Sequence, residues 1–501
     1  MPVTAEFLLL YGSILVIFGL FLSKASFKLG MPTLLLFLGI GIFAGSGSFG
    51  IELNNPDVAQ FIGVLALTVI LFSGGMDTDF KDIRPVIGPG AALASIGVLI
   101  TAVLTGTFIY YLFLLFDGIS LTYPQALLCG AVMSSTDSAS VFSILRSKSV
   151  QLKQRLKPTL EFESGSNDPM AFLLTILLIG VIQAGEFNTW SALLLLAQQL
   201  IFGTILGYVL GKVAVWMLNR FVLPSTSLYS ILLLACSSFI FAATSKVGGN
   251  GYLAVYIAGL VVGNARISNK KTIANFFDGF AWLWQLIMFL TLGLLVNAKD
   301  LWSVAIPALL IGVFVIFIGR PLSVFLTLLP FPKFFTLKAK AYISWVGLRG
   351  AAPIIFATYP WLACVEHSQL IFHIVFFITL VSLVIQGGTV TYMADKLDLI
   401  DRSKKEKKFA SFDLPDEIKS ALSEIIVNKS MIEKGNKLKD LPLPDHTLAL
   451  MIQRDGHYKI PKGNTVLKEG DHVLLISDDE EALLESYEEL GITTYSLERN
   501  T

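Results

Sequence analysis

The stretch FESGSNDP, from Phe162 to Pro169, places two carboxylates and an amide at the start of a segment apolar enough to cross a bilayer. On insertion scales a carboxylate at the centre of a spanning helix is unfavourable by roughly 2.5 to 3.5 kcal/mol, so it persists where it has a partner or a function. Glu163 and Asn167 are four residues apart, and so are Ser164 and Asp168. On a helix these four oxygen-bearing side chains form a cluster about one turn tall. We expect this cluster to bind a small cation.

The composition indicates a membrane protein. The 501 residues are 54% hydrophobic and only 15% charged, and many apolar stretches approach the ~20 residues that cross a hydrocarbon core. Residues 1–395 hold 37 of the charged side chains, and the last 106 residues hold the other 37. We therefore expect a membrane domain followed by a small soluble domain. The three cysteines show no paired spacing, so neither a disulfide framework nor a metal site of cysteine type is indicated.

The apolar pattern predicts an all-α polytopic membrane protein with thirteen transmembrane helices. Six helices on either side of a central one allow two inverted six-helix repeats, an arrangement common in secondary transporters. The expected spans are residues 7–23, 30–46, 58–75, 87–116, 123–145, 160–184, 189–218, 226–245, 250–264, 276–296, 301–329, 339–358 and 369–394.

The distribution of basic residues between these spans predicts the orientation. With the N-terminus outside, the inner loops hold sixteen lysines and arginines and the outer loops hold two, Lys246 and Lys299. Lys338 and Lys340 are counted here in an inner loop. Cytoplasmic loops of membrane proteins carry an excess of lysine and arginine, so the side with sixteen is expected to be cytoplasmic. We therefore expect a multi-pass protein of the bacterial cytoplasmic membrane with a cytoplasmic C-terminus.

Two spans in corresponding positions of the halves contain helix-weakening sequences. SSTDS, Ser134 to Ser138, interrupts the fifth span, and GLRGAAP, Gly347 to Pro353, interrupts the fifth span of the second half. Freed backbone groups at membrane depth are tolerated only where protein or water satisfies them. We therefore expect two broken crossing helices, with Asp137 beside helix N-termini and Arg349 beside helix C-termini, where their charges offset the helix dipoles.

The predicted spans contain three acids, Asp137, Glu163 and Asp168, and two bases, Arg320 and Arg349, so one acid has no basic partner. If Arg320 pairs with Glu163 and Arg349 pairs with Asp137, then Asp168 is left to be neutralised by an ion that comes and goes. A proton and a monovalent cation both suffice. Competition of the two for one carboxylate, exposed first to one side and then to the other, is exchange.

These residues carry a family resemblance. The stretch resembles the ESxxND signature of cation/proton antiporters of the electroneutral, NhaP-like sodium/proton exchanger branch, in which an Asn precedes the ion-binding Asp. FSGGM at Phe72–Met76 and YLAVYIAGLVVGN at Tyr252–Asn264 add to the resemblance, which covers nearly all of residues 5–395. Ser138 stands where the family often has Pro, and Gly165-Ser166 stands where bulkier residues are usual.

The resemblance implies roles for individual residues. Asp168 is the expected carrier of ion and proton, and Ser164 and Thr136 are expected ligands of the transported monovalent cation. Asn167 occupies the place of an Asp in the electrogenic branch, and Thr136 with Asp137 matches the TD motif of the unwound fifth span. Glu163 and Arg320 resemble a buried supporting ion pair, and Arg349 resembles the arginine of the second crossing helix. No cofactor is required.

The tail changes to alternating patterns after a basic linker. Glu424–Val427, Leu448–Arg454 and His472–Ser477 read as strands, Asp455-Gly456 as a hairpin turn, and Ser477 with Glu480 as a capping box opening a helix through Leu490. This part resembles the RCK_C (TrkA-C) lobe of potassium transport proteins. The resemblance implies a small α/β cytoplasmic domain that forms dimers and in some relatives binds a cyclic dinucleotide. We expect an antiporter domain at 1–395, a basic linker at 396–412 and an RCK_C regulatory domain at 413–495.

The expected function is therefore exchange of a monovalent cation, K⁺ in preference to Na⁺, for H⁺, in a homodimer embedded in lipid and without a nucleic-acid partner. Potassium is favoured because of the regulatory lobe. Other interpretations stay open: an RCK-gated cation channel, although no TVGYG-type filter occurs; a membrane enzyme, although no nucleophile and base pair stands out; or a Na⁺-selective exchanger whose tail serves only dimerisation. Each site residue also has a purely structural interpretation. Asp168 would then be a protonated, hydrogen-bonded core acid, and Asp137 and Arg349 would only neutralise helix ends. Arg320 would extend its side chain to the inner surface.

Overall fold

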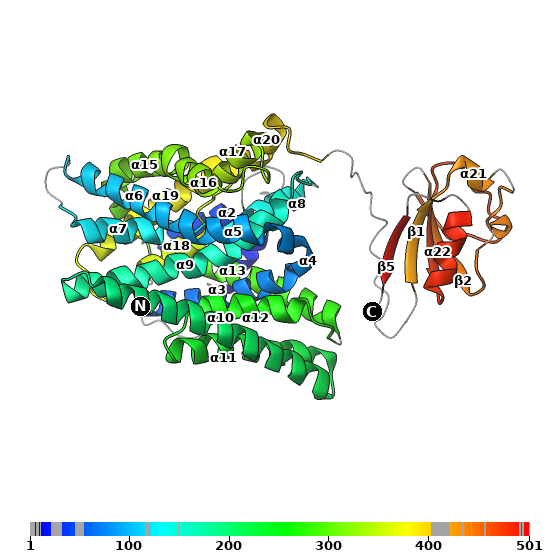
Figure 1. The fold of residues 1–501 in the computed structure, drawn as a ribbon, viewed down its shortest axis with the longest axis horizontal. Helices are drawn as coiled ribbons and strands as arrows, with labels where there is room; N and C mark the ends of the chain where they lie inside the picture. Colours follow the sequence, from blue (N-terminus) through cyan, green and yellow to red (C-terminus); the bar gives the residue numbers. More distant parts are fainter. Residues whose placement is uncertain are drawn as a thin grey trace. The chain divides into compact units, whose positions relative to one another are not determined.

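The computed structural model describes residues 6, 10, 12–21, 33–45, 55–115, 120–148, 150–267, 269–401, 421–432, 435–441, 443–454, 457–489, 492 and 495–499. The chain forms two compact units, Met1–Arg402 and Ser403–Thr501. The first is a helical bundle and the second is built on a β-sheet (Figure 1). Lys24 and Lys28, two of the basic residues expected in inner loops, lie outside the described residues. The same holds for residues 402–412 of the expected linker.

Among the described residues of the first unit, eight helices are long and apolar enough to span a membrane. This confirms the predicted polytopic helical domain, while the count of thirteen remains a prediction. The eight are α3 (Pro56–Asp77), the helix Phe80–Phe113, α9 (Leu156–Ala184), α10 (Thr189–Arg220), α11 (Thr226–Lys246), α13 (Lys270–Leu294), Ala305–Thr327 and Ser368–Lys396. The shorter helices are Gly12–Phe21, α2 (Thr33–Gly45), α7 (Tyr123–Val132), α8 (Ser138–Ser147), α12 (Gly251–Gly263), α14 (Ala298–Ser303), α17 (Leu337–Trp345) and α18 (Ala351–Leu362).

Three of the long helices contain a five-residue π-helical turn. Phe80–Phe113 consists of α4 (Phe80–Ile83), η1 (Arg84–Val86), α5 (Ile87–Ala92), the π-turn η2 (Leu93–Gly97) and α6 (Val98–Phe113). Ala305–Thr327 consists of α15 (Ala305–Phe314), the π-turn η3 (Val315–Gly319) and α16 (Arg320–Thr327). Ser368–Lys396 consists of α19 (Ser368–Ser382), the π-turn η4 (Leu383–Gly387) and α20 (Gly388–Lys396).

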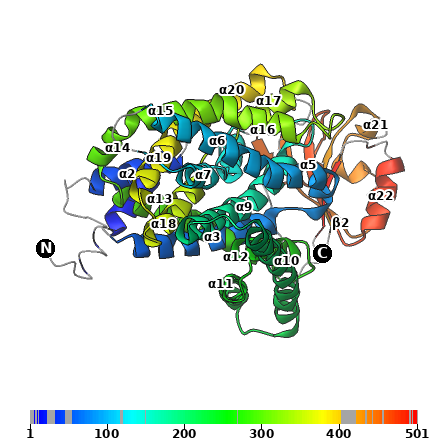
Figure 2. The same ribbon diagram turned by 60° about the vertical axis from the view of Figure 1, so that its left-hand side comes forward.

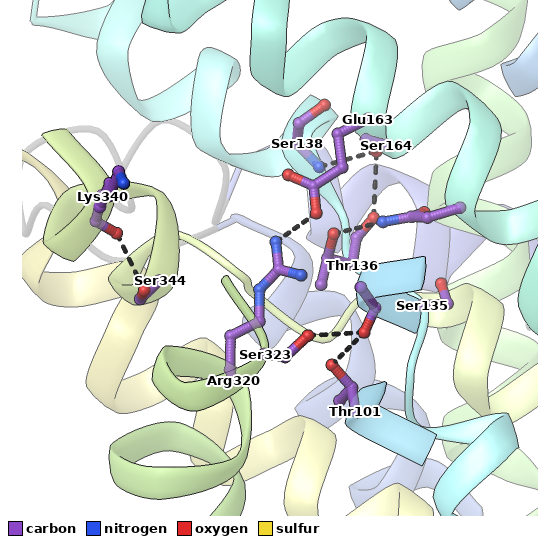
Figure 3. A network of polar contacts seen from close by, with 12 residues as sticks. Thr101, Ser135, Thr136, Ser138, Glu163, Ser164, Arg320, Ser323, Lys340 and Ser344 are labelled. Carbon is purple, nitrogen blue, oxygen red and sulfur yellow. Dashed lines mark hydrogen bonds and ion pairs between the residues drawn. The ribbon is translucent and has the colours of Figure 1, made fainter. Parts of the chain in front are cut away.

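A π-turn disturbs the regular hydrogen-bond ladder of its helix. At η2 the carbonyl of Gly97 accepts hydrogen bonds from the hydroxyls of Thr101, at 2.7 Å, and of Ser323 on α16, at 2.6 Å (Figure 3). Two of the three π-turns therefore lie on neighbouring helices that are joined at this point.

Both predicted helix breaks are present. α7 ends at Val132 and α8 begins at Ser138, while α17 ends at Trp345 and α18 begins at Ala351. The two breaks touch, because the backbone N–H of Asp137 donates to the carbonyl of Leu348 at 2.8 Å. Serine, threonine and glycine at the breaks leave backbone groups that the opposite break satisfies, as expected for irregular backbone buried in protein.

α12 packs closely against α3 and α10, and these elements lie together in both ribbon views (Figures 1 and 2). Glycines make this approach possible. A Cβ on Gly75 of α3 would lie 2.5 Å from the Tyr256 carbonyl oxygen of α12, and one on Gly207 of α10 would lie 2.6 Å from the Ala254 carbonyl oxygen. Small residues at such crossings are the usual means of helix packing in membranes.

The second unit contains a five-stranded antiparallel sheet in the order β3-β2-β4-β1-β5. Its elements are β1 (Ala421–Ile426), α21 (Lys429–Ile432), η5 (Leu438–Asp440), β2 (Thr447–Arg454), β3 (His457–Lys459), β4 (His472–Ser477), α22 (Glu480–Glu489) and β5 (Tyr495–Arg499). Val473 and Leu475 of β4 share a buried cluster with Leu483 and Tyr487 of α22. The three predicted strands and the final helix are therefore present.

Two details of the predicted tail need comment. The expected hairpin turn Asp455-Gly456 lies outside the described residues, although Arg454 and His457 on either side of it pair across β2 and β3. The prediction that Ser477 caps the final helix is wrong. Asp479 Oδ1 accepts from the backbone N–H of Ala482 at 3.1 Å, so Asp479 caps α22, while the Ser477 hydroxyl bonds to Thr447 on the neighbouring strand.

Candidate functional site

Asp168 lies in α9, buried at 8% exposure, directly before the helix-interior Pro169. Its Oδ1 accepts a hydrogen bond from the hydroxyl of Ser135, in the break between α7 and α8. Among the described residues no lysine or arginine forms an ion pair with Asp168. A buried carboxylate that faces a neutral hydroxyl is therefore held at the level of the helix break.

Ser135 joins this carboxylate to the second break. Its carbonyl oxygen accepts from Arg349 Nη1 at 2.7 Å, and the backbone N–H of Arg349 donates to the Ser382 hydroxyl at 2.9 Å. Arg349 is 2% exposed. The guanidinium therefore donates to a backbone carbonyl in the first break, three residues beyond the end of α7, and the expected role of Arg349 at helix C-termini stays a prediction.

The expected ligands Thr136, Ser164 and Asn167 form a second set of contacts beside Asp168. The Ser164 hydroxyl donates to the Thr136 carbonyl at 3.0 Å and accepts from the Ser138 N–H at 3.1 Å (Figure 3). Asn167 Nδ2 donates to the Thr136 hydroxyl at 2.5 Å, and its buried Oδ1 has no partner among the described residues. The first half of α9 is thus bonded to the unwound segment through oxygen atoms that a cation can also use.

Asp137 caps α8. Its Oδ1 accepts from the backbone N–H of Ser140 at 3.1 Å, and its Oδ2 accepts from the Ser140 hydroxyl. Gly350, the N-cap of α18, packs so closely on this carboxylate that a Cβ there would overlap it. The carboxylate therefore lies at the N-termini of both α8 and α18, where negative charge is stabilised. The expected ion pair between Asp137 and Arg349 is wrong, because the carboxylate faces N-termini and the guanidinium faces a carbonyl.

Glu163 and Arg320 form a buried ion pair, with side chains 2% and 1% exposed (Figure 3). Arg320 starts α16 directly after the π-turn η3, and a Cβ on Gly347 of the second break would lie 2.8 Å from its Nε. Glycine is therefore needed at position 347 for the guanidinium to pass. The alternative that Arg320 snorkels to the surface is excluded by its burial.

The sequence did not indicate the positions of two residues of this region, Ser135 and Lys340. Ser135 was not singled out, although it lies within the SSTDS motif, because nothing in the motif tells which serine reaches Asp168. Lys340, expected in an inner loop, lies buried on α17, where its Nζ donates to the Leu328 carbonyl at 3.2 Å. Figure 3 shows the Lys340 carbonyl accepting from the Ser344 hydroxyl of the same helix. The apolar pattern of α16 and α17 contains no sign of the contact with Leu328.

The donor set is chemically simple. Asp168 and Ser135 supply a carboxylate and a hydroxyl, and the contacts among Ser164, Thr136 and Asn167 add hydroxyl, carbonyl and amide oxygens; such oxygens suit hard cations. Among the described residues no group of three His, Cys, Asp or Glu side chains is arranged to hold a metal ion permanently. The arrangement therefore suits reversible binding of a proton or a monovalent cation.

Comparison with known proteins agrees with this chemistry. Residues 13–396 match the family described as sodium/hydrogen exchanger, transmembrane, and residues 422–487 match the TrkA-C domain. The chain is 41% identical over 477 residues to the K⁺/H⁺ antiporter NhaP of Alkalimonas amylolytica, covering 93% of this chain and 81% of the relative. It is 38% identical over 480 residues to the K⁺/H⁺ antiporter NhaP2 of Shewanella oneidensis, covering 95% and 81%.

More distant matches include a sodium transporter and a solved structure. The Na⁺/H⁺ antiporter ApNhaP of Aphanothece halophytica is 28% identical over 423 residues, covering 82% of this chain and 75% of the relative. The structure of the sodium proton antiporter MjNhaP1 from Methanocaldococcus jannaschii at pH 8 superimposes with a TM-score of 0.66 at 24% identity, covering 77% of this chain and all of that one, which supports the fold. The chain belongs to the sodium/hydrogen exchanger family and is a membrane-embedded cation/proton antiporter, a secondary transporter with a TrkA-C domain.

Proposed function

We propose that the protein exchanges K⁺ for H⁺, one for one, by alternating access, with Asp168 as the group that binds each ion in turn. The observation that carries this proposal is the position of Asp168, a buried acid in the crossing region whose described partner is a neutral hydroxyl. Glu163 is paired with Arg320, and Asp137 is held by helix N-termini. A carboxylate without a fixed counter-charge needs a mobile one.

Ser164, Thr136, Asn167 and Asp137 are the proposed surroundings of the bound ion. Ser164 and Asn167 both donate to Thr136, and among the described residues the buried Asn167 Oδ1 has no hydrogen-bond partner. A buried acceptor without a partner is unfavourable by about 1–3 kcal/mol. A cation or a water molecule near Asn167 would relieve that penalty.

Potassium is the proposed cation because two similar relatives, at 41% and 38% identity, are named K⁺/H⁺ antiporters, whereas a relative named a Na⁺/H⁺ antiporter is 28% identical. Electroneutrality follows from a single exchangeable carboxylate: it binds one proton or one monovalent cation, so the charge moved is the same in both directions.

The proposed architecture is thirteen spans in two inverted repeats, inserted in the bacterial cytoplasmic membrane with the C-terminus inside. The π-turns η2 and η3 support the repeats, since they lie in the fourth and eleventh predicted spans, which are corresponding positions. The breaks in the fifth and twelfth predicted spans correspond in the same way. A reporter fused to the C-terminus tests the orientation. It is expected to be accessible only from the cytoplasm.

We infer that the tail is an RCK_C regulatory domain at residues 413–495, joined by a linker at 396–412 to the antiporter domain at 1–395. It is proposed to form homodimers and to bind a small regulator such as a cyclic dinucleotide. The support is the TrkA-C match and the five-stranded sheet. Isothermal titration of the full-length protein with cyclic dinucleotides tests the ligand, and cross-linking in native membranes tests the dimer.

Exchange is tested directly in proteoliposomes loaded with a pH-sensitive dye and titrated with KCl and NaCl. Recovery of fluorescence at lower K⁺ than Na⁺ is the expected result. An imposed membrane potential, set in the absence of any ion gradient, should not drive transport. Proton flux driven by potential alone would contradict the one-for-one stoichiometry, and conductance far above carrier turnover would indicate a channel.

A further inference from the structure

Ser134 and Ser135 are adjacent, chemically identical and equally buried, yet they make different contacts. Ser134 is 0% exposed, and its hydroxyl donates to the Ala131 carbonyl at 2.6 Å, which satisfies an acceptor at the end of α7. Ser135 is 1% exposed, and its hydroxyl instead donates to Asp168 Oδ1. One serine completes a helix end, and the other reaches the carboxylate that the proposed exchange uses.

A hydroxyl has one proton to donate and two lone pairs to accept with. The Ser135 hydroxyl donates its proton in a hydrogen bond to Asp168, which stabilises the charged carboxylate. A cation that binds Asp168 supplies the positive charge itself, so the hydroxyl is released from donating. Rotation about the Cβ–Oγ bond then turns a lone pair of the same oxygen toward the cation.

The backbone of Ser135 is held in place for this exchange of roles. Its carbonyl accepts from Arg349 Nη1 at 2.7 Å, and two residues later the N–H of Asp137 donates to the Leu348 carbonyl at 2.8 Å. Both partners belong to the second helix break. The Ser135 oxygen is therefore positioned by the opposite repeat before an ion arrives, and a ligand held in this way binds without first paying for its ordering.

We propose that Ser135 Oγ is a ligand of the transported cation, which alternates between donating a hydrogen bond to Asp168 and coordinating the ion bound there. This inference rests on the proposed role of Asp168 as the ion carrier. It adds a ligand from the first break to the set that the family resemblance implies, and it makes Arg349 a positioning residue that acts through the Ser135 carbonyl.

The test compares Ser135→Ala, Ser135→Thr and the matched control Ser134→Ala with the unchanged protein, in proteoliposomes containing equal amounts of folded antiporter by size exclusion. The apparent KM and the maximal rate are measured for K⁺ and for Na⁺, near neutral pH and about two pH units higher. Ser135→Ala is expected to raise the KM for the transported cation about ten-fold with little change in maximal rate, as loss of one charge-assisted contact predicts. Ser135→Thr, which keeps the hydroxyl, should restore the KM, and Ser134→Ala should leave it unchanged.

The alkaline measurement separates a cation ligand from a group that only influences the proton. At high pH proton competition is weak, so the ten-fold difference in KM should persist if the hydroxyl coordinates the cation. Its disappearance there would overturn the proposal, as would a fall in maximal rate at unchanged KM. Failure of the proposed function is seen separately, as an Asp168→Asn variant that still exchanges ions, or as an unchanged protein that does not.

Discussion

At the scale of single residues, the acids of the crossing region differ in what faces them. Glu163 faces a guanidinium, Asp137 faces the N-termini of two half-helices, and Asp168 faces a hydroxyl. The first two interactions each place fixed positive charge or a helix dipole beside the carboxylate. A hydroxyl carries no charge, so Asp168 is the acid whose counter-charge the proposed exchange leaves to a transported ion.

Asp168→Asn should abolish exchange while leaving the fold intact, because the amide matches the protonated acid in shape but binds neither a proton nor a cation. Loss of at least a hundred-fold in rate is expected, measured as dye recovery in vesicles. Glu186→Gln, which changes an exposed acid just beyond the end of the same helix, is the control and should exchange at the normal rate. Measurable exchange by a folded Asp168→Asn protein would refute the proposed carrier role.

Removing either member of the Glu163–Arg320 pair should lower stability as well as transport. Each single change leaves a buried charge unpaired, which is expected to reduce the free energy of unfolding by about 3–5 kcal/mol. The measurement is the midpoint of thermal unfolding in detergent for Glu163→Gln, Arg320→Met and the double variant, which should regain part of the loss. Lys153→Ala breaks an exposed pair with Asp398, and its effect should stay within about 1 kcal/mol.

Residue identities could be predicted from the sequence better than residue contacts. Asp168, Glu163 and Arg320 stood out because a charge in an apolar segment is conspicuous. Which hydroxyl reaches Asp168 is decided by how two segments 33 residues apart are packed, and Ser134, Ser135, Ser138 and Ser164 look alike in the sequence. The wrong Asp137–Arg349 pairing has the same origin, since a count of charges does not include the charge of helix ends.

At the scale of elements, the breaks in the two crossing helices could be predicted because Gly, Ser, Thr and Pro weaken a helix locally. Both breaks fall where these residues interrupt apolar runs, between Val132 and Ser138 and between Trp345 and Ala351. The π-turns could not be predicted in this way, since LASIG, VIFIG and LVIQG contain no distinctive residue order. A π-turn depends on contacts from neighbouring helices, such as the Ser323 hydroxyl on Gly97.

The packing of α9 on α12 depends on a small residue at position 165. The ring of Tyr256 occupies the space where a Cβ on Gly165 would lie, so this position needs glycine as long as the ring stays in place. Gly165→Ala should therefore displace α9 or the ring, with a loss of about 1–3 kcal/mol in unfolding free energy and a slower exchange. Thermal unfolding and vesicle transport are the measurements.

A second change provides the control for this packing argument. Adding Tyr256→Leu to Gly165→Ala makes room for the new methyl group and should restore part of the stability. The test is whether the two stability losses add. If the loss of unfolding free energy in the double variant equals the sum of the losses in Gly165→Ala and Tyr256→Leu, the two residues are independent and the steric explanation is wrong.

At the scale of the whole molecule, the second unit contains an ion pair of its own, between Asp471 and Arg454. In the second unit, Asp471 accepts from Arg454 Nε at 2.7 Å, from Arg454 Nη2 at 2.6 Å and from the Lys468 N–H at 2.8 Å. Burial raises the pKa of Asp471, but these hydrogen bonds and the nearby positive charges outweigh it and hold the pKa below its usual value. Ionised Asp471 thus ties β2 to the start of β4.

A depressed pKa gives a defined pH window. The contribution of Asp471 to the stability of this unit is fully present above its unfolded-state pKa of about 3.9, and is lost as the pH falls through the lower folded-state value. Protection factors from hydrogen exchange of β2 and β4 in the full-length protein should therefore fall on acidification below about pH 4. Asp471→Asn should lower protection at neutral pH and flatten this decline, whereas Asp445→Asn, at an exposed position, should change neither.

Removal of the tail tests whether transport and regulation reside in separate units. A chain ending at Arg402 retains the whole first compact unit, including both helix breaks and the Glu163–Arg320 pair, so it should fold and exchange ions with a KM within about two-fold of the full-length value. Because the tail is the proposed regulatory domain, any response of the rate to added cyclic dinucleotide should be present in the full-length protein and absent from the truncated one. Exchange is measured in vesicles with both proteins oriented alike. A truncated protein that is folded and inactive would show that the second unit belongs to the transport machinery, and an equal nucleotide response in both would place the regulatory site in the membrane unit.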